Sequence, residues 1–308
     1  MVSLKSNGIV KKSLKVIKSS YTGWLFIMPM ILGTILFCAI PFVQSFILAF
    51  MDYDMMRPPQ WIGIENFKAI FTVDFREVWG SFRITFIYAF ISIPVTMFLS
   101  YFLALLLNRK IPGMMFFRVL IYLPCIIPPI ASAIVWKDIF APQIGIMNRI
   151  VQAFGLPASD WLSSASSALM TIIFMSFWGL GGGMILWLAA FKNIPVDLYE
   201  AASLDGASKL RQIFSITIPM SSAMIFYNLI NGVIGSMQMF GSFLITDNGG
   251  RGPDNSLYFI SVRIYQEAFV SFNMGYASAL AWILFFVIAC MSALLFKHSK
   301  WVFYGEDM

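Results

Sequence analysis

Six stretches of this 308-residue chain contain no Asp, Glu, Lys or Arg. They are residues 24–50, 84–107, 119–136, 168–191, 220–246 and 274–296. Each has 18 to 27 residues, and a helix needs roughly 17–25 apolar residues to cross a bilayer, with tilt for the longest. Only 12% of the chain is charged, against roughly 25% in soluble domains. We therefore predict an all-α membrane protein with six transmembrane helices.

The distribution of Lys and Arg sets the expected orientation. With the N-terminus in the cytoplasm, the inner segments hold 13 of the 21 basic residues and the outer segments hold 8, as the positive-inside rule requires. We expect both termini to be cytoplasmic, with a basic segment over 1–23, the transmembrane domain over 24–296 and a tail over 297–308. The first span is far longer than a signal-peptide core of roughly 7–15 residues, so we expect it to be retained.

The sequence offers no catalytic centre and no metal site. The single histidine, His298, follows the last span, and Cys38, Cys125 and Cys290 lie inside apolar spans, where we expect inert buried thiols. No cluster of His, Cys, Asp and Glu has the spacing of metal ligands. We therefore expect neither an enzyme nor a bound metal. The net charge of +6 comes from residues that flank the spans, so it does not indicate a nucleic-acid partner.

The spans also lack the ionisable side chains that proton-coupled carriers place in the membrane. If the chain moves a solute uphill, we expect a separate subunit to supply the energy through a cytoplasmic docking surface. Two other classes stay open. One is a self-sufficient secondary carrier or facilitator for a neutral polar solute, coupled through backbone carbonyls. The other is a membrane scaffold without a cavity.

Prolines and glycines predict irregular packing in the third and fourth spans. Pro124, Pro128 and Pro129 fall within the third span, and such breaks are tolerated where neighbouring helices or cavities satisfy the freed backbone groups. Gly179 and Gly183 are four residues apart in the fourth span, a spacing that favours close contact between helices.

The cytoplasmic loop 192–219 predicts two short helices joined at a glycine. Pro195 suits a first helical turn, Gly206 permits a left-handed turn, and Pro219 restarts the chain into the fifth span. One side of the second helix is predicted to carry Leu210, Ile213, Phe214 and Thr217. This compact hairpin suits a protein partner, and a helix lying on lipid headgroups is the alternative.

The loop carries a motif of fixed spacing. It reads Glu200-Ala201-Ala202-x-x-Asp205-Gly206-Ala207 and then Ile216-x-Ile218-Pro219, and it resembles the EAA loop of binding-protein-dependent ABC importer permeases. The resemblance implies a coupling helix that seats in a cleft of a cytoplasmic ATPase. The coupling residues that it implies are Glu200, Ala201, Ala202, Asp205, Gly206, Ala207 and Pro219.

The resemblance covers the chain from about Trp24 to Phe296 and includes segments 61–67, 117–129 and 248–269. These segments are similar to the carbohydrate-type permeases related to the maltose and glycerol-phosphate systems, in the first of their two non-identical permease subunits. The resemblance implies an ABC type I importer permease fold in a bacterial inner membrane, and a carbohydrate solute, which we expect to be an oligosaccharide. The implied partners are a second homologous permease, an ATPase dimer that binds ATP and magnesium, an extracytoplasmic solute-binding protein and membrane lipid. The chain itself is expected to bind no cofactor.

A polar stripe on the fifth span predicts a wall of the solute path. Asn228, Asn231, Gly235, Gln238 and Ser242 are spaced 3, 4, 3 and 4 apart, so on one continuous helix they share an arc of about 80°. Carboxamides that face lipid cost several kcal/mol each, so this face must point into protein or water. Polar contacts between packed helices are the alternative. The candidate solute-path residues are Tyr227, Asn228, Asn231, Gln238, Ser242 and, from the fourth span, Trp178.

Overall fold

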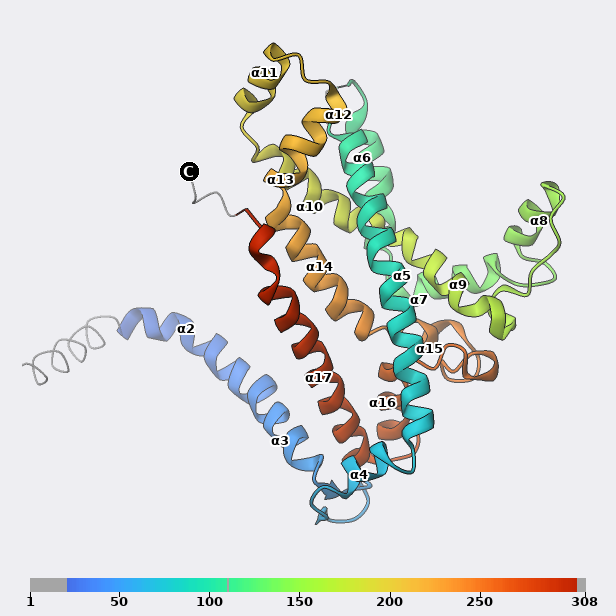
Figure 1. The fold of residues 1–308 in the computed structure, drawn as a ribbon. Helices are drawn as coiled ribbons and strands as arrows, with labels where there is room; N and C mark the ends of the chain where they lie inside the picture. Colours follow the sequence, from blue (N-terminus) through green and yellow to red (C-terminus); the bar gives the residue numbers. More distant parts are fainter. Residues whose placement is uncertain (1–20, 110, 304–308) are drawn as a thin grey trace, which may run out of the picture.

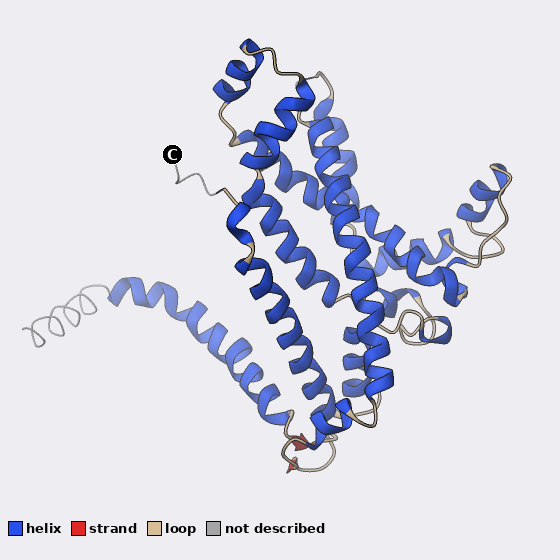
Figure 2. Cartoon of the chain, viewed as in Figure 1, coloured by secondary structure: helices blue, strands red, loops and turns tan. Residues whose placement is uncertain are grey.

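The structure, a computed structural model, describes residues 21–109 and 111–303. The basic segment expected over 1–23 lies outside the described residues except for its last three, and so does the end of the tail, 304–308. The described chain is a bundle of long and short helices (Figure 1 and Figure 2). Its one sheet is a two-stranded antiparallel pair of β1, Met51–Asp52, and β2, Gln60–Trp61. The all-α membrane architecture predicted from the sequence is therefore confirmed.

Long helices form the body of the bundle, and shorter ones form its ends and connections. The main helices are α2 Tyr21–Thr34, α3 Ile40–Leu48, α5 Phe75–Leu107, α7 Pro129–Ile139, α9 Ala165–Ser176, α10 Leu180–Lys192, α14 Ser222–Met237, α16 Ile260–Phe269 and α17 Met274–Lys297. The shorter helices are α4 Glu65–Phe71, α6 Met114–Tyr122, α8 Ile146–Ala153, α11 Val196–Leu204, α12 Lys209–Gln212, α13 Ile218–Met220 and α15 Gly241–Ile245.

Four helical segments in the described chain are long and apolar enough to cross a membrane: Gly23–Leu48, Phe75–Leu107, Ala165–Lys192 and Met274–Lys297. Two further spans exist only if bent helix pairs are counted. The first pair, Met114–Ile126 with Pro129–Ile139, bends by 97°. The second, Lys209–Met220 with Ser222–Met237, bends by 65°. If each bent pair is counted as one span, the described chain has up to six spans, the number that the sequence predicts.

The two bends have local causes. In the third span, the helix stops at Ile126, and Ile127 and Pro128 are extended before Pro129 starts α7. In the fifth, Ser221 leaves helical geometry, and its hydroxyl donates to the carbonyl of Thr217 at 2.7 Å. A side chain that competes for a carbonyl in this way is a recognised source of helix bending.

Helix α5 is the central element of the fold. Along its 33 residues it contributes to three apolar clusters, with Phe82 in the first, Tyr88 in the second and Ala104 in the third. It packs against α10, α14, α9 and α16. A single long helix thus fixes the position of both halves of the chain.

The glycines of the fourth span allow the close approach that their spacing predicts. A Cβ at Gly181 would collide with the backbone of Ile121 and Tyr122, and one at Gly183 would press against Ser100 at 3.2 Å. At Gly179 nothing lies within 4 Å. The tight contact with α6 is therefore made at Gly181, between the two positions that the spacing singled out.

The first span stands apart from the bundle. Helix α2 diverges from the rest of the chain in Figure 1, whereas α3 returns to pack on α17. The contact is aromatic, with 4.7 Å between the ring centroids of Phe46 and Trp282. The indole nitrogen of Trp282 also donates to the hydroxyl of Ser45 at 3.1 Å. Apolar side chains along α2 are therefore exposed in the isolated chain.

The three cysteines are exposed, so the expectation that they are buried within this chain is wrong. The sequence showed that Cys38, Cys125 and Cys290 lie in apolar spans. It did not show which face each one takes, because a face toward lipid or another subunit is as apolar as a face toward the core.

Candidate functional site

The loop between α10 and α14 forms a hairpin at one end of the bundle. Figure 1 places α11 and α12 at the end opposite α4 and the β1–β2 pair. Helix α11 holds Glu200, Ala201 and Ala202, and it ends at Asp205. Gly206 then takes a left-handed conformation, with φ +77°.

This ending is a Schellman cap. The amide of Gly206 donates to the carbonyl of Ser203 at 3.1 Å, and the amide of Ala207 donates to the carbonyl of Ala202 at 2.9 Å. Both bonds satisfy carbonyls that the helix end leaves free, and glycine is preferred because the cap needs a positive φ. The cap thus explains the motif's Gly206, whereas Ala202 and Ala207 contribute to it only through backbone atoms.

Polar side chains join the two arms of the hairpin. Gln212 is 3% exposed and donates to Ser203 Oγ at 2.9 Å and to the carbonyl of Ala207 at 3.3 Å. The hydroxyls of Tyr199 and Thr217 lie 2.9 Å apart. These contacts fix α11 against α12 and the π-helical turn Ile213–Thr217 that follows it.

The prediction that Leu210, Ile213, Phe214 and Thr217 lie on one side of the second helix is wrong. Thr217 is buried, whereas Leu210 and Phe214 are exposed. The reason is that only Lys209–Gln212 is α-helical, and the π-helical turn shifts the faces of the residues after it. The hairpin consequently exposes apolar side chains beside charged ones such as Glu200 and Arg211, and Leu204 at its tip is 90% exposed.

Pro219 lies within α13, which continues the π-helical turn Ile213–Thr217 without a break in helical geometry. The restart that the sequence predicts at this proline is displaced slightly, because the bend itself falls at Ser221. The hydroxyl of Ser221 lies 3.0 Å from that of Tyr101 on α5. The base of the hairpin is in this way tied to the central helix.

A polar cavity of about 290 Å³ lies between α5, α9–α10 and α14. Two of the predicted solute-path residues, Asn228 and Asn231, line it. Each amide nitrogen donates to a carbonyl one turn back on α14, at 2.9 Å for Asn228 and 2.8 Å for Asn231. The amide oxygens are therefore the groups left to accept hydrogen bonds from a solute.

The cavity has further polar residues that sequence reasoning missed. Thr96 and Ser100 of α5 and Ser176 at the end of α9 line it. The signal was present in the sequence, because Ser92, Thr96 and Ser100 recur every four residues within an apolar span, which places them on one face of a helix.

A second cavity, of about 320 Å³, adjoins the first. Ser176 and Gly179 line both. Trp178 lines the second, where its ring meets that of Trp136 edge to face at 5.4 Å between centroids. The two cavities together form a polar and aromatic surface that continues from α14 to α7.

The other predicted path residues are not brought together by the structure. Helix α14 ends at Met237, so Gln238 is its C-cap and Ser242 lies on a separate helix, α15. Ser242 is fully buried, and its hydroxyl donates to the carbonyl of Leu257 at 3.2 Å. Tyr227 is exposed on α14 but does not line the cavity of Asn228 and Asn231. The prediction that these residues share one face of a continuous helix is therefore wrong beyond Met237.

Comparison with known proteins identifies the family. Residues 85–302 match the family model described as "Binding-protein-dependent transport system inner membrane component". The chain belongs to this family of ABC importer permeases.

Relatives of this permease match over nearly its whole length. It is 38% identical over 298 residues to "Probable ABC transporter permease protein YesP" of Bacillus subtilis (strain 168), with 96% of each chain covered. It is 29% identical over 284 residues to "Probable starch degradation products transport system permease protein AmyD" of Thermoanaerobacterium thermosulfurigenes, covering 92% of this chain and 95% of that protein.

The fold of the permease also matches a solved structure. A chain of the bacterial alginate ABC transporter, crystallised in complex with an alginate pentasaccharide-bound periplasmic protein, superposes with a TM-score of 0.79 at 20% identity. The match covers 93% of this chain and 96% of that chain. The importer permease fold predicted from the sequence is confirmed, and permeases of this family are not themselves enzymes.

Proposed function

We propose that this chain is one of two permease subunits of an ATP-driven importer for an oligosaccharide, in a bacterial inner membrane. In this proposal it forms half of the solute path, and a cytoplasmic ATPase dimer, which binds ATP and magnesium, drives it through the α11–α12 hairpin. An extracytoplasmic solute-binding protein delivers the sugar. A second, homologous permease completes the path.

The observation that carries the proposal is the geometry of the hairpin. It is held rigidly by Gln212 and the Schellman cap, yet it presents Val196, Leu204 and Phe214 to solvent. Exposed apolar side chains on a rigid support are typical of a protein interaction surface. Family membership supports a cytoplasmic ATPase as the partner.

The polar cavity supports a sugar as the solute. Asn228, Asn231, Thr96 and Ser100 offer neutral donors and acceptors, and no charged side chain lines the cavity. Hydroxyl-rich neutral solutes suit such a lining better than ions, because an ion would lose its hydration without a compensating charge. The name of the relative AmyD, a starch degradation products transport permease, supports a carbohydrate as the solute.

The test is the stimulation of ATP hydrolysis by the solute-loaded binding protein in the reconstituted complex. Gly206→Pro should abolish it, because proline fixes φ near −65° and the cap needs +77°. Glu200→Lys, an exposed change on the same helix, should also abolish stimulation if this face seats in the ATPase.

Gly206→Asn is the matched control, since asparagine tolerates a positive φ. It should retain most of the stimulation. Full stimulation of the Gly206→Pro and Glu200→Lys complexes, assembled normally, would count against the proposal.

A further inference from the structure

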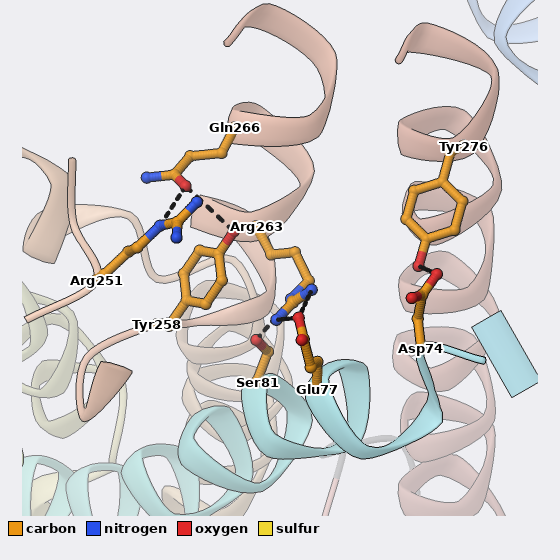
Figure 3. Close-up of polar contacts among 8 residues, drawn as sticks. All are labelled: Asp74, Glu77, Ser81, Arg251, Tyr258, Arg263, Gln266 and Tyr276. Atoms are coloured by element: carbon orange, nitrogen blue, oxygen red, sulfur yellow. Dashed lines mark hydrogen bonds and ion pairs between the residues drawn. The ribbon is translucent and has the colours of Figure 1, made fainter. Parts of the chain in front are cut away.

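A polar cleft lies apart from both cavities described above. The cavity lined by Asn228 and Asn231 is called the sugar cavity here. The polar cleft has a volume of about 380 Å³ and is lined by the first turns of α5, the loop after α15 and the start of α16. Figure 3 shows Glu77, Ser81, Arg251, Tyr258 and Arg263 of this cleft with neighbouring polar residues. Ser81 of this cleft and Ile93 of the sugar cavity are on the same helix, roughly 18 Å apart at about 1.5 Å per residue. The cleft is therefore nearer the end of the bundle that holds α4.

One of its two arginines is fully engaged. Arg263 is 6% exposed; its Nε donates to Ser81 Oγ at 3.0 Å, and its η nitrogens lie 3.3 and 3.4 Å from Glu77 Oε2. Its guanidinium also lies 4.6 Å from the centroid of the Tyr258 ring. This arginine holds α16 against α5.

The other arginine is only partly engaged. Arg251 is exposed, its Nε donates to Gln266 Oε1 at 2.7 Å, and its guanidinium lies 4.9 Å from the centroid of Tyr258. Within residues 21–109 and 111–303, the η nitrogens of Arg251 donate to no acceptor. The edge of the guanidinium formed by its two η nitrogens, which can bind a carboxylate with two parallel bonds, is thus free.

The support beneath Arg251 is built from buried groups. Gln266 is 5% exposed, accepts a bond from the Tyr258 hydroxyl at 3.2 Å and donates to the carbonyl of Gly249 at 2.6 Å. Burial raises the pKa of Tyr258, and the charges of Arg263 and Arg251 lower it in part. Tyr258 therefore stays protonated at neutral pH and keeps donating to Gln266. Because Arg251 is already oriented, little rotamer freedom is lost when it binds a ligand.

The charges of the cleft limit what it binds. Glu77 and Asp254 also line it, so with the two arginines its net charge is zero and it does not collect anions by long-range attraction. Figure 3 shows the Tyr258 ring between the two guanidinium groups, which leaves it poorly placed to stack on a sugar. What remains is directed bonding, in which two parallel N–H groups bind the two oxygens of one carboxylate.

We propose that Arg251 is a docking contact for the carboxylate of an Asp or Glu side chain on the solute-binding protein. This inference rests on the proposed function, which supplies that partner. A side chain of a protein is favoured over a carboxylate on the solute, because the cleft is lined by residues of an outer loop and shares no lining residue with the sugar cavity.

The experiment is a titration of the complex in nanodiscs with solute-loaded binding protein, with ATP hydrolysis as the readout. R251Q should raise the concentration for half-maximal stimulation by roughly 10-fold or more, while the rate at saturation stays the same. R251K keeps the charge but loses the two-pronged geometry, so it should recover less than half of the lost affinity. If R251Q does not assemble, R251K alone tests the proposal. Its half-stimulating concentration of binding protein should then be about 3-fold or more above that of the wild type.

R57Q is the matched control. Arg57 is also an exposed arginine of an outer loop, but its guanidinium is already paired with Asp54 at 2.7 Å, so its removal should change the half-stimulating concentration less than twofold.

Three results would overturn the inference. One is that assembled wild-type and R251Q complexes need the same concentration of binding protein for half-maximal stimulation. Another is a loss of uptake by R251Q that is confined to carboxylate-bearing sugars, which would assign the carboxylate to the solute. The third is a wild-type complex that no loaded binding protein stimulates, which would contradict the proposed function as well.

Discussion

At the scale of single residues, Gly206 and Gln212 shape the hairpin, because Gly206 takes the left-handed turn and Gln212 bonds to Ser203 and Ala207 across it. The Gly206 turn was predictable because a left-handed position selects glycine. The role of Gln212 was not, because its partners Ser203 and Ala207 meet it only after the turn closes. The contacts of Arg251 could not be predicted for the same reason, because Gln266 and Tyr258 meet it only in the folded chain.

Gln212→Leu should loosen the hairpin. The change removes three hydrogen bonds from a buried position, two that Gln212 donates and one that it accepts from Lys209 Nζ, and should cost about 1–3 kcal/mol of local stability. Hydrogen exchange of residues 196–204 should accelerate roughly 5- to 150-fold. Arg211→Ala, on the exposed side of α12, should leave exchange unchanged, and equal rates in both variants would contradict this role.

Asn231→Leu separates the two interpretations of the polar stripe. Asn231 is exposed in the chain, and its nitrogen bonds only to its own helix. Losing one bond to a solute costs roughly 1 kcal/mol, so maximal sugar uptake should fall about 5-fold while assembly stays intact. Loss of assembly without an effect on the uptake of assembled complexes would favour a helix-packing role.

At the scale of helices, the six stretches without charged residues located the spans. They did not show where each helix ends or in which direction it runs. The apolar run 220–246 was expected to be one helix, yet α14 stops at Met237 and the remainder folds into α15, which packs on α7. Hydropathy records burial in any apolar surroundings, whether lipid or a neighbouring helix. It therefore cannot report where an apolar chain turns.

Helix packing at Gly181 gives a prediction with a paired control. Gly181→Ala should cost about 1–3 kcal/mol, because the added carbon collides with the backbone of α6. Gly182→Ala places its carbon 3.8 Å from Cys125 Sγ and should be neutral or stabilising by roughly 0.5–1 kcal/mol. Thermal unfolding of the two purified variants compares them, and equal stability would refute the packing argument.

At the scale of the whole molecule, the isolated chain is visibly incomplete. Most residues of α2 from Gly23 onward are exposed and none is buried, and apolar residues of the hairpin are exposed as well. The sequence predicted partners through the resemblance of its loop. It could not say which faces they cover, because apolar side chains are accommodated both against lipid and against a neighbouring subunit.

The expected orientation can be tested with two cysteines in a variant whose native cysteines are replaced by serine. Leu204 is 90% exposed in the hairpin and Val73 is 83% exposed near α4. With both termini in the cytoplasm, a membrane-impermeant maleimide should label Leu204→Cys only from the cytoplasmic side. It should label Val73→Cys only from outside, and the reverse pattern would invert the topology.

The central claim is that nucleotide hydrolysis on a partner drives this chain. Its most direct test is oligosaccharide accumulation in proteoliposomes that contain both permeases and the loaded binding protein, with and without the ATPase. We predict accumulation against the gradient only when ATPase and ATP are both present. Accumulation by the permeases alone would contradict the claim and favour a self-sufficient carrier.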